Sequence, residues 1–193
     1  MIDPTNITNY NLTDSELEEH IFFWVLAAGK NGREAARRLE VLLSGLTYNN
    51  RSPFTTIKDV YETNKPSPLS DVMKNFGIGC YNLKSKTLYD LSVSELNLRT
   101  CLPEDLEKIK GIGMKTARCF IIHSRPDARY AGLDTHMLKH LREKGVSNVP
   151  KSTPSSMKEY LRLEKEFLKL SDAAEMSPSS YDLMVWNQYS KGV

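Results

Sequence analysis

The stretch that decides the fold runs from Leu102 to Arg142 and reads LPEDLEKIKGIGMKTARCFIIHSRPDARYAGLDTHMLKHLR. At its centre, Gly111-Ile112-Gly113 separates two helical patterns, over about 103–110 and about 114–125. Two glycines around one aliphatic residue allow a very tight turn, because glycine adopts backbone conformations that other residues avoid. The second helix then begins with unpaired backbone N–H groups, which form a natural seat for a phosphate. The stretch therefore predicts a helical hairpin that can hold a phosphate.

The glycine turn between the two helices also has two other interpretations. Glycine turns between helices are common corners in helical cores, and the hairpin alone does not exclude such a corner. A nucleotide-binding P-loop does not fit, because Met114 stands where the glycine before the lysine belongs and no glycine stands five residues earlier.

Helical patterns cover nearly the whole chain, and no two segments read as paired strands. Thr13 and Glu16 can form a capping box, which predicts a helix that ends near Ala28, with Gly29 as its stop. Further helices are expected over about 32–43, 68–76, 81–91 and 134–144, and after Thr153-Pro154 and Ser177-Pro178. The sequence thus predicts an all-α protein, with one domain over residues 1–193.

Composition and charge exclude several classes of protein. The 193 residues are 40% hydrophobic, which is ordinary for a globular protein, and the net charge is only +2. A nucleic-acid surface must therefore come from the local placement of charge. The longest apolar run, residues 21–28, is too short to cross a membrane, and no leader is visible, so we expect a cytoplasmic protein. Three cysteines cannot ligate an ordinary iron–sulfur cluster.

Three motifs together resemble the helix-hairpin-helix superfamily of DNA glycosylases. They are the hairpin, Gly113-Met114-Lys115-Thr116-Ala117 in its second helix, and the later Leu133-Asp134-Thr135-His136. Residues 80–86 also resemble the element before the hairpin in endonuclease III relatives, and residues 181–192 resemble the end of compact archaeal-type 8-oxoguanine glycosylases.

This resemblance implies a fold, a partner and an ion. The fold would have two lobes, with the N- and C-terminal helices in one lobe and the active site in the cleft between them. The partner would be double-stranded DNA with a damaged base, bound by a monomer. A K⁺ or Na⁺ ion would lie on the hairpin carbonyls of Glu107, Ile109 and Ile112, with no other cofactor.

Lys115 and Asp134 are the expected catalytic residues. An amine that attacks the sugar C1′ forms a Schiff base, which then favours β-elimination of the 3′ phosphate. A nearby carboxylate stabilises the positive charge of the transition state and moves protons. Burial and the helix start would lower the pKa of Lys115, whereas Asp134 would raise it, and the sequence leaves this balance open.

Other residues are expected to contact DNA or the base. Phosphate contacts are predicted for the hairpin Gly111, Ile112 and Gly113 and for Lys84, Lys86 and Arg118. Lys30 or Asn31, in the turn after the first helix, would fill the gap left by a flipped base, unless this is an ordinary turn. Trp186 would stack on the flipped base, and Asp182 or Lys191 would read its edge, although Trp186 equally fits a core position.

The expected function is base-excision repair. The chain would act as a DNA glycosylase and abasic-site lyase that removes an oxidised base, with 8-oxoguanine favoured. Three alternatives remain open: an oxidised-pyrimidine enzyme of the endonuclease III type without an iron–sulfur cluster, a non-catalytic helix-hairpin-helix DNA-binding module, and a zinc protein built on His136 and His140.

Overall fold

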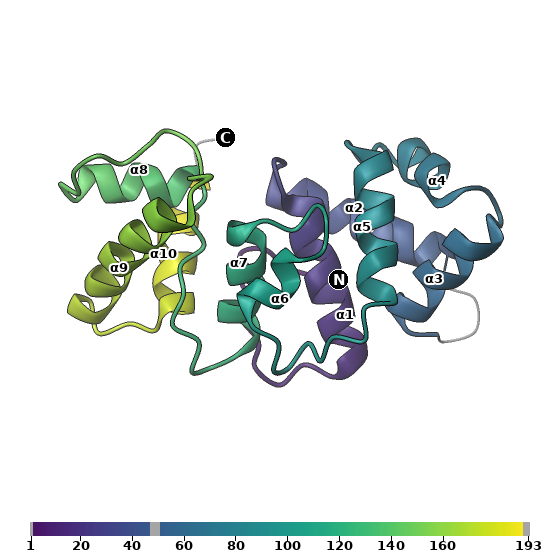
Figure 1. Cartoon of the computed structure of the whole chain (residues 1–193), viewed down its shortest axis with the longest axis horizontal. Coiled ribbons are helices and arrows are strands. Elements are labelled where there is room, and N and C mark those ends of the chain that lie inside the picture. The colour runs from purple at the N-terminus through teal and green to yellow at the C-terminus, as the bar shows by residue number, and fades with distance from the viewer. Residues whose placement is uncertain (1, 47–50, 191–193) are drawn as a thin grey trace. The chain divides into compact units, whose positions relative to one another are not determined.

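The computed structural model describes residues 2–46 and 51–190, and its regular elements there are all helices. The helices, shown in Figure 1, are α1 (Asp14–Ala27), α2 (Gly32–Leu46), α3 (Pro53–Thr63), α4 (Leu69–Asn75), α5 (Tyr81–Ser92), α6 (Pro103–Glu107), α7 (Met114–Ser124), α8 (Thr135–Glu143), α9 (Met157–Ala173) and α10 (Pro178–Ser190). The all-α prediction is confirmed.

The chain divides into two compact units. Unit 1 comprises Met1–Pro4 and Asn11–Gly113, and unit 2 comprises Thr5–Tyr10 and Met114–Val193. The first helix, α1, therefore belongs to unit 1, and the segment Thr5–Tyr10 belongs to unit 2 with the C-terminal helices. Within unit 1, α1 packs on α2, α3 and α5, and the expectation that the N- and C-terminal helices form one lobe stays a prediction.

Unit 1 is built around α1, which is apolar on nearly all of its faces. Its residues from Ile21 to Leu26 are all buried, so this helix forms the centre of the unit. It begins as the sequence predicts: the Thr13 hydroxyl accepts a hydrogen bond from the backbone N–H of Glu16, and the Glu16 carboxylate accepts one from the backbone N–H of Thr13.

Unit 1 also contains a helix that the sequence analysis missed. The Ser52 side chain caps the start of α3, and Pro53 occupies its first turn. The same Ser-Pro pattern predicts the start of α10 correctly at Pro178, so the signal for α3 was present in the sequence. In contrast, α6 ends at Glu107 and α9 begins only at Met157, both inside the expected bounds.

Unit 2 packs α7, α8 and α9 against α10. Its core is apolar and aromatic, with the Tyr160, Leu163, Phe167, Leu138 and Val185 side chains fully buried. The rings of Phe167 and Tyr181 meet edge to face with centroids 5.5 Å apart. This packing holds the starts of α7, α8 and α10 as fixed points within one rigid core.

No helix in the described part of the chain combines the length and the apolar character needed to cross a membrane.

Candidate active site

The hairpin turn lies at the end of unit 1, and its bend requires glycine at Gly111. This residue has a φ of +101°, and a Cβ placed on it would lie 2.2 Å from the hydroxyl oxygen of Thr87. The same hydroxyl lies 2.7 Å from the carbonyl oxygen of Lys110 and donates to it, so α5 holds the turn in place. The Ile112 side chain is buried, whereas Gly113 has open space at its Cα. The tight turn predicted from Gly111 to Gly113 is confirmed.

Lys115 follows directly in the first turn of α7, where its amine meets three side chains of unit 2. The amine is hydrogen-bonded to the Cys119 thiol, four residues later on the same helix, and the carboxylates of Asp134 and Asp182 act on it electrostatically. The Lys115 side chain as a whole keeps partial contact with solvent. The expected catalytic pair is therefore in one cluster, together with a second carboxylate and a thiol.

Gly132 allows this cluster to close. A Cβ placed on Gly132 would lie 2.4 Å from the Cys119 sulfur and 3.1 Å from Asp182 Oδ1. Both side chains thus pack directly on the backbone of the loop that leads to Asp134. Because real Cβ atoms do not approach so closely, any larger residue at position 132 would push Cys119 and Asp182 away from Lys115.

Asp134 is held rigidly because it also caps α8. Its Oδ1 accepts a 2.8 Å hydrogen bond from the backbone N–H of Met137. Burial raises the pKa of the Asp134 carboxyl, Lys115 lowers it and Asp182 raises it, and the net pKa lies above the ordinary value. A carboxylate with a raised pKa is a better proton acceptor than one in water.

The net shift of the Lys115 pKa, whose direction the sequence leaves open, favours the protonated amine. Burial lowers the pKa of the Lys115 amine, but the hydrogen bond to Cys119 and the carboxylates of Asp134 and Asp182 raise it by more, so the net pKa lies above its ordinary value. Burial also raises the pKa of the Cys119 thiol, which therefore stays neutral near pH 7 and acts as a hydrogen-bond partner. Lys115 must accordingly lose a proton before it can attack a sugar.

Asp182 is fixed from its other side by a histidine. The His123 Nε2 lies 3.2 Å from Asp182 Oδ2, and the His123 Nδ1 lies 2.7 Å from the hydroxyl oxygen of Thr8. The sequence analysis expected Asp182 to read the base edge and did not identify His123 or Thr8. A helical signal existed for part of this set, since Lys115, Cys119 and His123 recur at four-residue spacing along α7.

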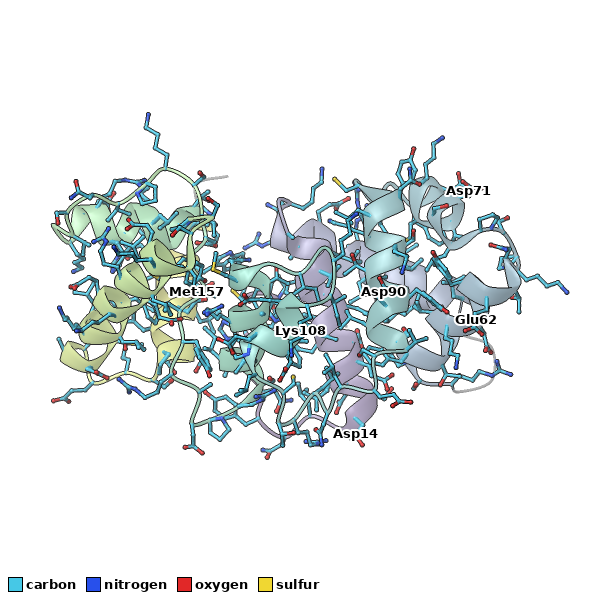
Figure 2. All side chains as sticks on the ribbon, viewed as in Figure 1. Asp14, Glu62, Asp71, Asp90, Lys108 and Met157 are labelled. Atoms are coloured by element: carbon cyan, nitrogen blue, oxygen red, sulfur yellow. The ribbon has the colours of Figure 1, made fainter. Side chains whose placement is uncertain are left out.

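Arg118 is a correction to the expected phosphate contacts. Its side chain is 1% exposed, and its Nε lies 3.2 Å from a carboxylate oxygen of Glu164. The guanidinium also lies 4.8 Å from the centre of the Tyr160 ring, and its Nη2 lies 3.8 Å from the sulfur of Met157, which Figure 2 labels at the start of α9. A guanidinium buried in this way cannot reach a DNA phosphate.

The Arg118 cluster instead supports the loop before Asp134. Glu164 accepts a 2.8 Å hydrogen bond from the backbone N–H of Ala131. The Tyr160 hydroxyl donates to the carbonyl of Ala131 at 2.7 Å and accepts from the backbone N–H of Leu133 at 3.2 Å. Glu164 and Tyr160 therefore fix the residues on either side of Gly132.

Lys84 is a second correction, for the same reason. It is 6% exposed, and its amine donates to the carbonyl of Leu26 at 2.8 Å, at the end of α1. Lys84 thus caps a helix inside unit 1 and does not face DNA. Lys86, in contrast, is exposed and pairs with Asp90 on the same helix, which Figure 2 labels, and its phosphate contact stays a prediction.

The remaining predicted contacts are placed as follows. Asn31 is exposed, and its side-chain oxygen accepts hydrogen bonds from the backbone N–H groups of Arg33 and Glu34 at the start of α2. Lys30 lies over the backbone of Gly79, where a Cβ would approach its amine to 2.9 Å. Trp186 is partly exposed on α10, four residues after Asp182, and Lys191 lies outside the described residues.

The histidines proposed for zinc have other partners. His140 Nε2 lies 2.8 Å from the Tyr181 hydroxyl, and the His136 ring stacks on Tyr189. Across residues 2–46 and 51–190, no group of three or more His, Cys, Asp or Glu side chains could hold a metal ion. On the hairpin, the carbonyl of Ile109 accepts a 3.0 Å hydrogen bond from the backbone N–H of Ile112. A monovalent cation there stays a prediction.

Comparison with known proteins supports the resemblance read from the motifs. The pattern that defines the Ogg-HhH family, 8-oxoguanine DNA glycosylase, matches residues 7–176. A sequence search of curated proteins gives no match.

Solved structures share the fold at low sequence identity. The 8-oxoguanine DNA glycosylase of Thermotoga maritima is 23% identical, with a TM-score of 0.70 over 92% of this chain and 81% of that one. The 8-oxoguanine glycosylase/lyase of Methanocaldococcus jannaschii, solved with a 15mer DNA that contains 8-oxoguanine, is 19% identical, with a TM-score of 0.68 over 94% of this chain and 84% of that one.

Both the predicted fold and the predicted family are thereby confirmed, because the family pattern covers most of the chain. The chain belongs to the Ogg-HhH family of 8-oxoguanine DNA glycosylases.

Proposed function

We propose that this protein removes 8-oxoguanine from double-stranded DNA and then cuts the strand by β-elimination. The observation that carries the proposal is the amine of Lys115 at the start of α7, hydrogen-bonded to Cys119 and set against Asp134 and Asp182. Family membership supports the glycosylase step, and the M. jannaschii glycosylase/lyase supports the lyase step by its similar fold.

The chemistry begins with a proton. Lys115 is an ammonium at rest, and the Asp134 carboxylate has the raised pKa of a group able to accept its proton. The free amine attacks C1′ as the bond from C1′ to the base breaks, and the base leaves with a proton. Opening of the sugar ring gives a Schiff base, loss of a C2′ proton follows, and the 3′ phosphate departs.

In this proposal, different residues bind the flipped base and the DNA duplex. Trp186 stacks on the flipped base and Asp182, one turn earlier on α10, lies at its edge. The backbone from Gly111 to Gly113, with a monovalent cation on the hairpin carbonyls, and Lys86 hold phosphates. Lys30 or Asn31 fills the gap in the duplex.

Borohydride trapping tests the function directly, because reduction makes the Schiff base permanent. We expect wild-type protein to form a covalent adduct with a duplex that contains 8-oxoguanine and none with the unmodified duplex. Lys115→Ala should abolish the adduct, whereas Lys165→Ala, which removes an exposed lysine of the same unit, should not.

Two results would contradict the proposal. Tight binding to the damaged duplex without any adduct would indicate a non-catalytic DNA-binding module. An adduct formed with a duplex that carries an oxidised pyrimidine, and not with 8-oxoguanine, would assign the chain to the endonuclease III type of activity.

A further inference from the structure

The segment Thr5–Tyr10, here named the strap, is fastened to two helices of unit 2. The backbone N–H of Asn9 donates to the carbonyl of His123 at 3.0 Å, near the end of α7. The Tyr10 hydroxyl lies 2.6 Å from the Ser179 hydroxyl, and the Thr5 carbonyl accepts from the Asn187 side chain at 3.3 Å, both on α10. The strap thus bridges the helix that carries His123 and the helix that carries Asp182.

A line of side chains runs from the strap to the active site. The Thr8 hydroxyl lies 2.7 Å from His123 Nδ1, and His123 Nε2 lies 3.2 Å from Asp182 Oδ2. The other oxygen of Asp182 faces Gly132, and the carboxylate acts on Lys115. The side chains of His123 and Asp182 are only 1% and 12% exposed, so water competes little for these contacts.

The partners of His123 determine which of its nitrogens carries hydrogen. A carboxylate only accepts, so Nε2 must be the N–H donor to Asp182. In a neutral ring, Nδ1 then accepts from the Thr8 hydroxyl, and in a charged ring it donates to the same oxygen. Both protonation states therefore keep the bond to Asp182, which makes Thr8 a suitable support for this histidine.

Asp182 needs such support because Asp134 is close by. The two carboxylates both act on Lys115, and the charge of Asp182 raises the pKa of Asp134, because two like charges placed close together repel. Without a donor behind it, Asp182 would lower its energy by turning away from Asp134. An N–H group at Oδ2 offsets this repulsion and keeps the carboxylate at the amine.

We infer that His123, held by Thr8 of the strap, is a positioning residue that fixes the carboxylate of Asp182 beside Lys115. This inference rests on the proposed function, because it concerns the efficiency of that reaction. It gives the N-terminal strap a role in catalysis, although no strap residue touches the reacting atoms.

The test is the single-turnover rate of base release from an 8-oxoguanine duplex. We expect His123→Leu to slow release by about 10- to 100-fold, as when a reacting group is misplaced by about 1 Å. His123→Gln, whose amide N–H can replace Nε2–H, should recover most of the rate. Thr8→Val, which removes only a hydroxyl, should slow release by several-fold, and Thr5→Val, in the same strap, should not.

A double-mutant cycle separates positioning from general damage to the fold. If His123 acts through Asp182, adding His123→Leu to Asp182→Asn should cause no further loss of rate. Losses that multiply, or a His123→Gln variant as slow as His123→Leu, would overturn the inference. Full activity in both His123→Leu and Thr8→Val would overturn it as well.

Failure of the proposed function would look different, since the wild-type protein itself would then release no 8-oxoguanine. Nitrogen NMR of the histidines reads the contact without any activity. We expect His123 to carry hydrogen on Nε2, and a neutral ring with hydrogen only on Nδ1 would overturn the inference.

Discussion

Two lysines, the buried Lys84 in unit 1 and the half-buried Lys115 in unit 2, have opposite electrostatic surroundings. Lys84 in unit 1 faces backbone carbonyls at the end of α1, and burial lowers its pKa. Lys115 in unit 2 is also subject to burial, which lowers its pKa, but Cys119 and two carboxylates reverse the shift. The comparison shows that burial alone does not define a catalytic lysine: the groups placed around the amine decide whether it caps a helix or exchanges a proton.

The largest expected effect comes from removing one carboxylate from the Lys115 site. Asp134→Asn should slow base release by about 10²- to 10⁴-fold, because the proton acceptor is lost. It should also lower the pKa of Lys115 and move the alkaline part of the pH–rate profile to lower pH. Single-turnover rates measured across pH check both effects.

Asparagine is a matched replacement because it also caps helices well. The thermal stability of Asp134→Asn should therefore stay close to that of the wild type, whereas Asp134→Ala should lose about 1 kcal/mol. If Asp134→Asn released the base at the wild-type rate, Asp134 would not be the proton acceptor of Lys115, and the proposed difference between Lys115 and Lys84 would be wrong.

Lys84→Met should give the opposite result, a loss of stability without a loss of chemistry. A hydrogen bond from a charged donor contributes about 1.5–3 kcal/mol, and Lys84→Met would leave the carbonyl of Leu26 without this donor. Urea unfolding measures the loss, and borohydride trapping should still give the adduct. If trapping disappeared in a folded Lys84→Met protein, Lys84 would belong to the catalytic machinery after all.

The smallest expected effect is a difference in how the two lysines couple stability to pH. The pKa of Lys115 is raised in the folded state, so its contribution is fully present below the unfolded value of about 10.4 and is lost as pH rises through the folded pKa. The pKa of Lys84 is lowered, so at lower pH its charged form stabilises the fold less than the neutral amine would. That penalty is relieved as pH rises from the folded pKa towards about 10.4.

Stability measured between about pH 8 and 11 can separate these contributions, since that range spans the ordinary lysine pKa. The advantage of the wild type over Lys115→Met should shrink as pH rises, and its advantage over Lys84→Met should grow. If both stability differences changed in the same direction with pH, the pKa values of Lys115 and Lys84 would not be shifted in opposite directions.

Much of the fold could be predicted from local signals. The capping box at Thr13, the glycine turn at Gly111 and the Ser-Pro start of α10 each act over a few residues, and each is present in the structure. The proposed catalytic pair, Lys115 and Asp134, also came from two local motifs. Burial of Lys84 was readable too, because Lys84, Leu88 and Leu91 share one face of α5, but a lysine was taken to face solvent.

The supports of the site were harder to predict, because they come from distant parts of the chain. Glu164 reaches the loop at Ala131 across 33 positions, and Thr8 reaches His123 across 115. No helical period connects such residues. Arg118 shows the consequence: it was predicted to contact a DNA phosphate, whereas its partner Glu164 can be identified only once α9 is packed in place.

The strap also limits the order in which the segments of the chain can pack during synthesis. Thr8 leaves the ribosome before residues 11–113 of unit 1, yet its partner His123 is synthesised 115 residues later. The strap can therefore dock on α7 only after α7 has been synthesised. A nascent chain that already contains Lys115 but not yet α10 lacks Asp182, so the proposed active site is complete only after α10 has been synthesised.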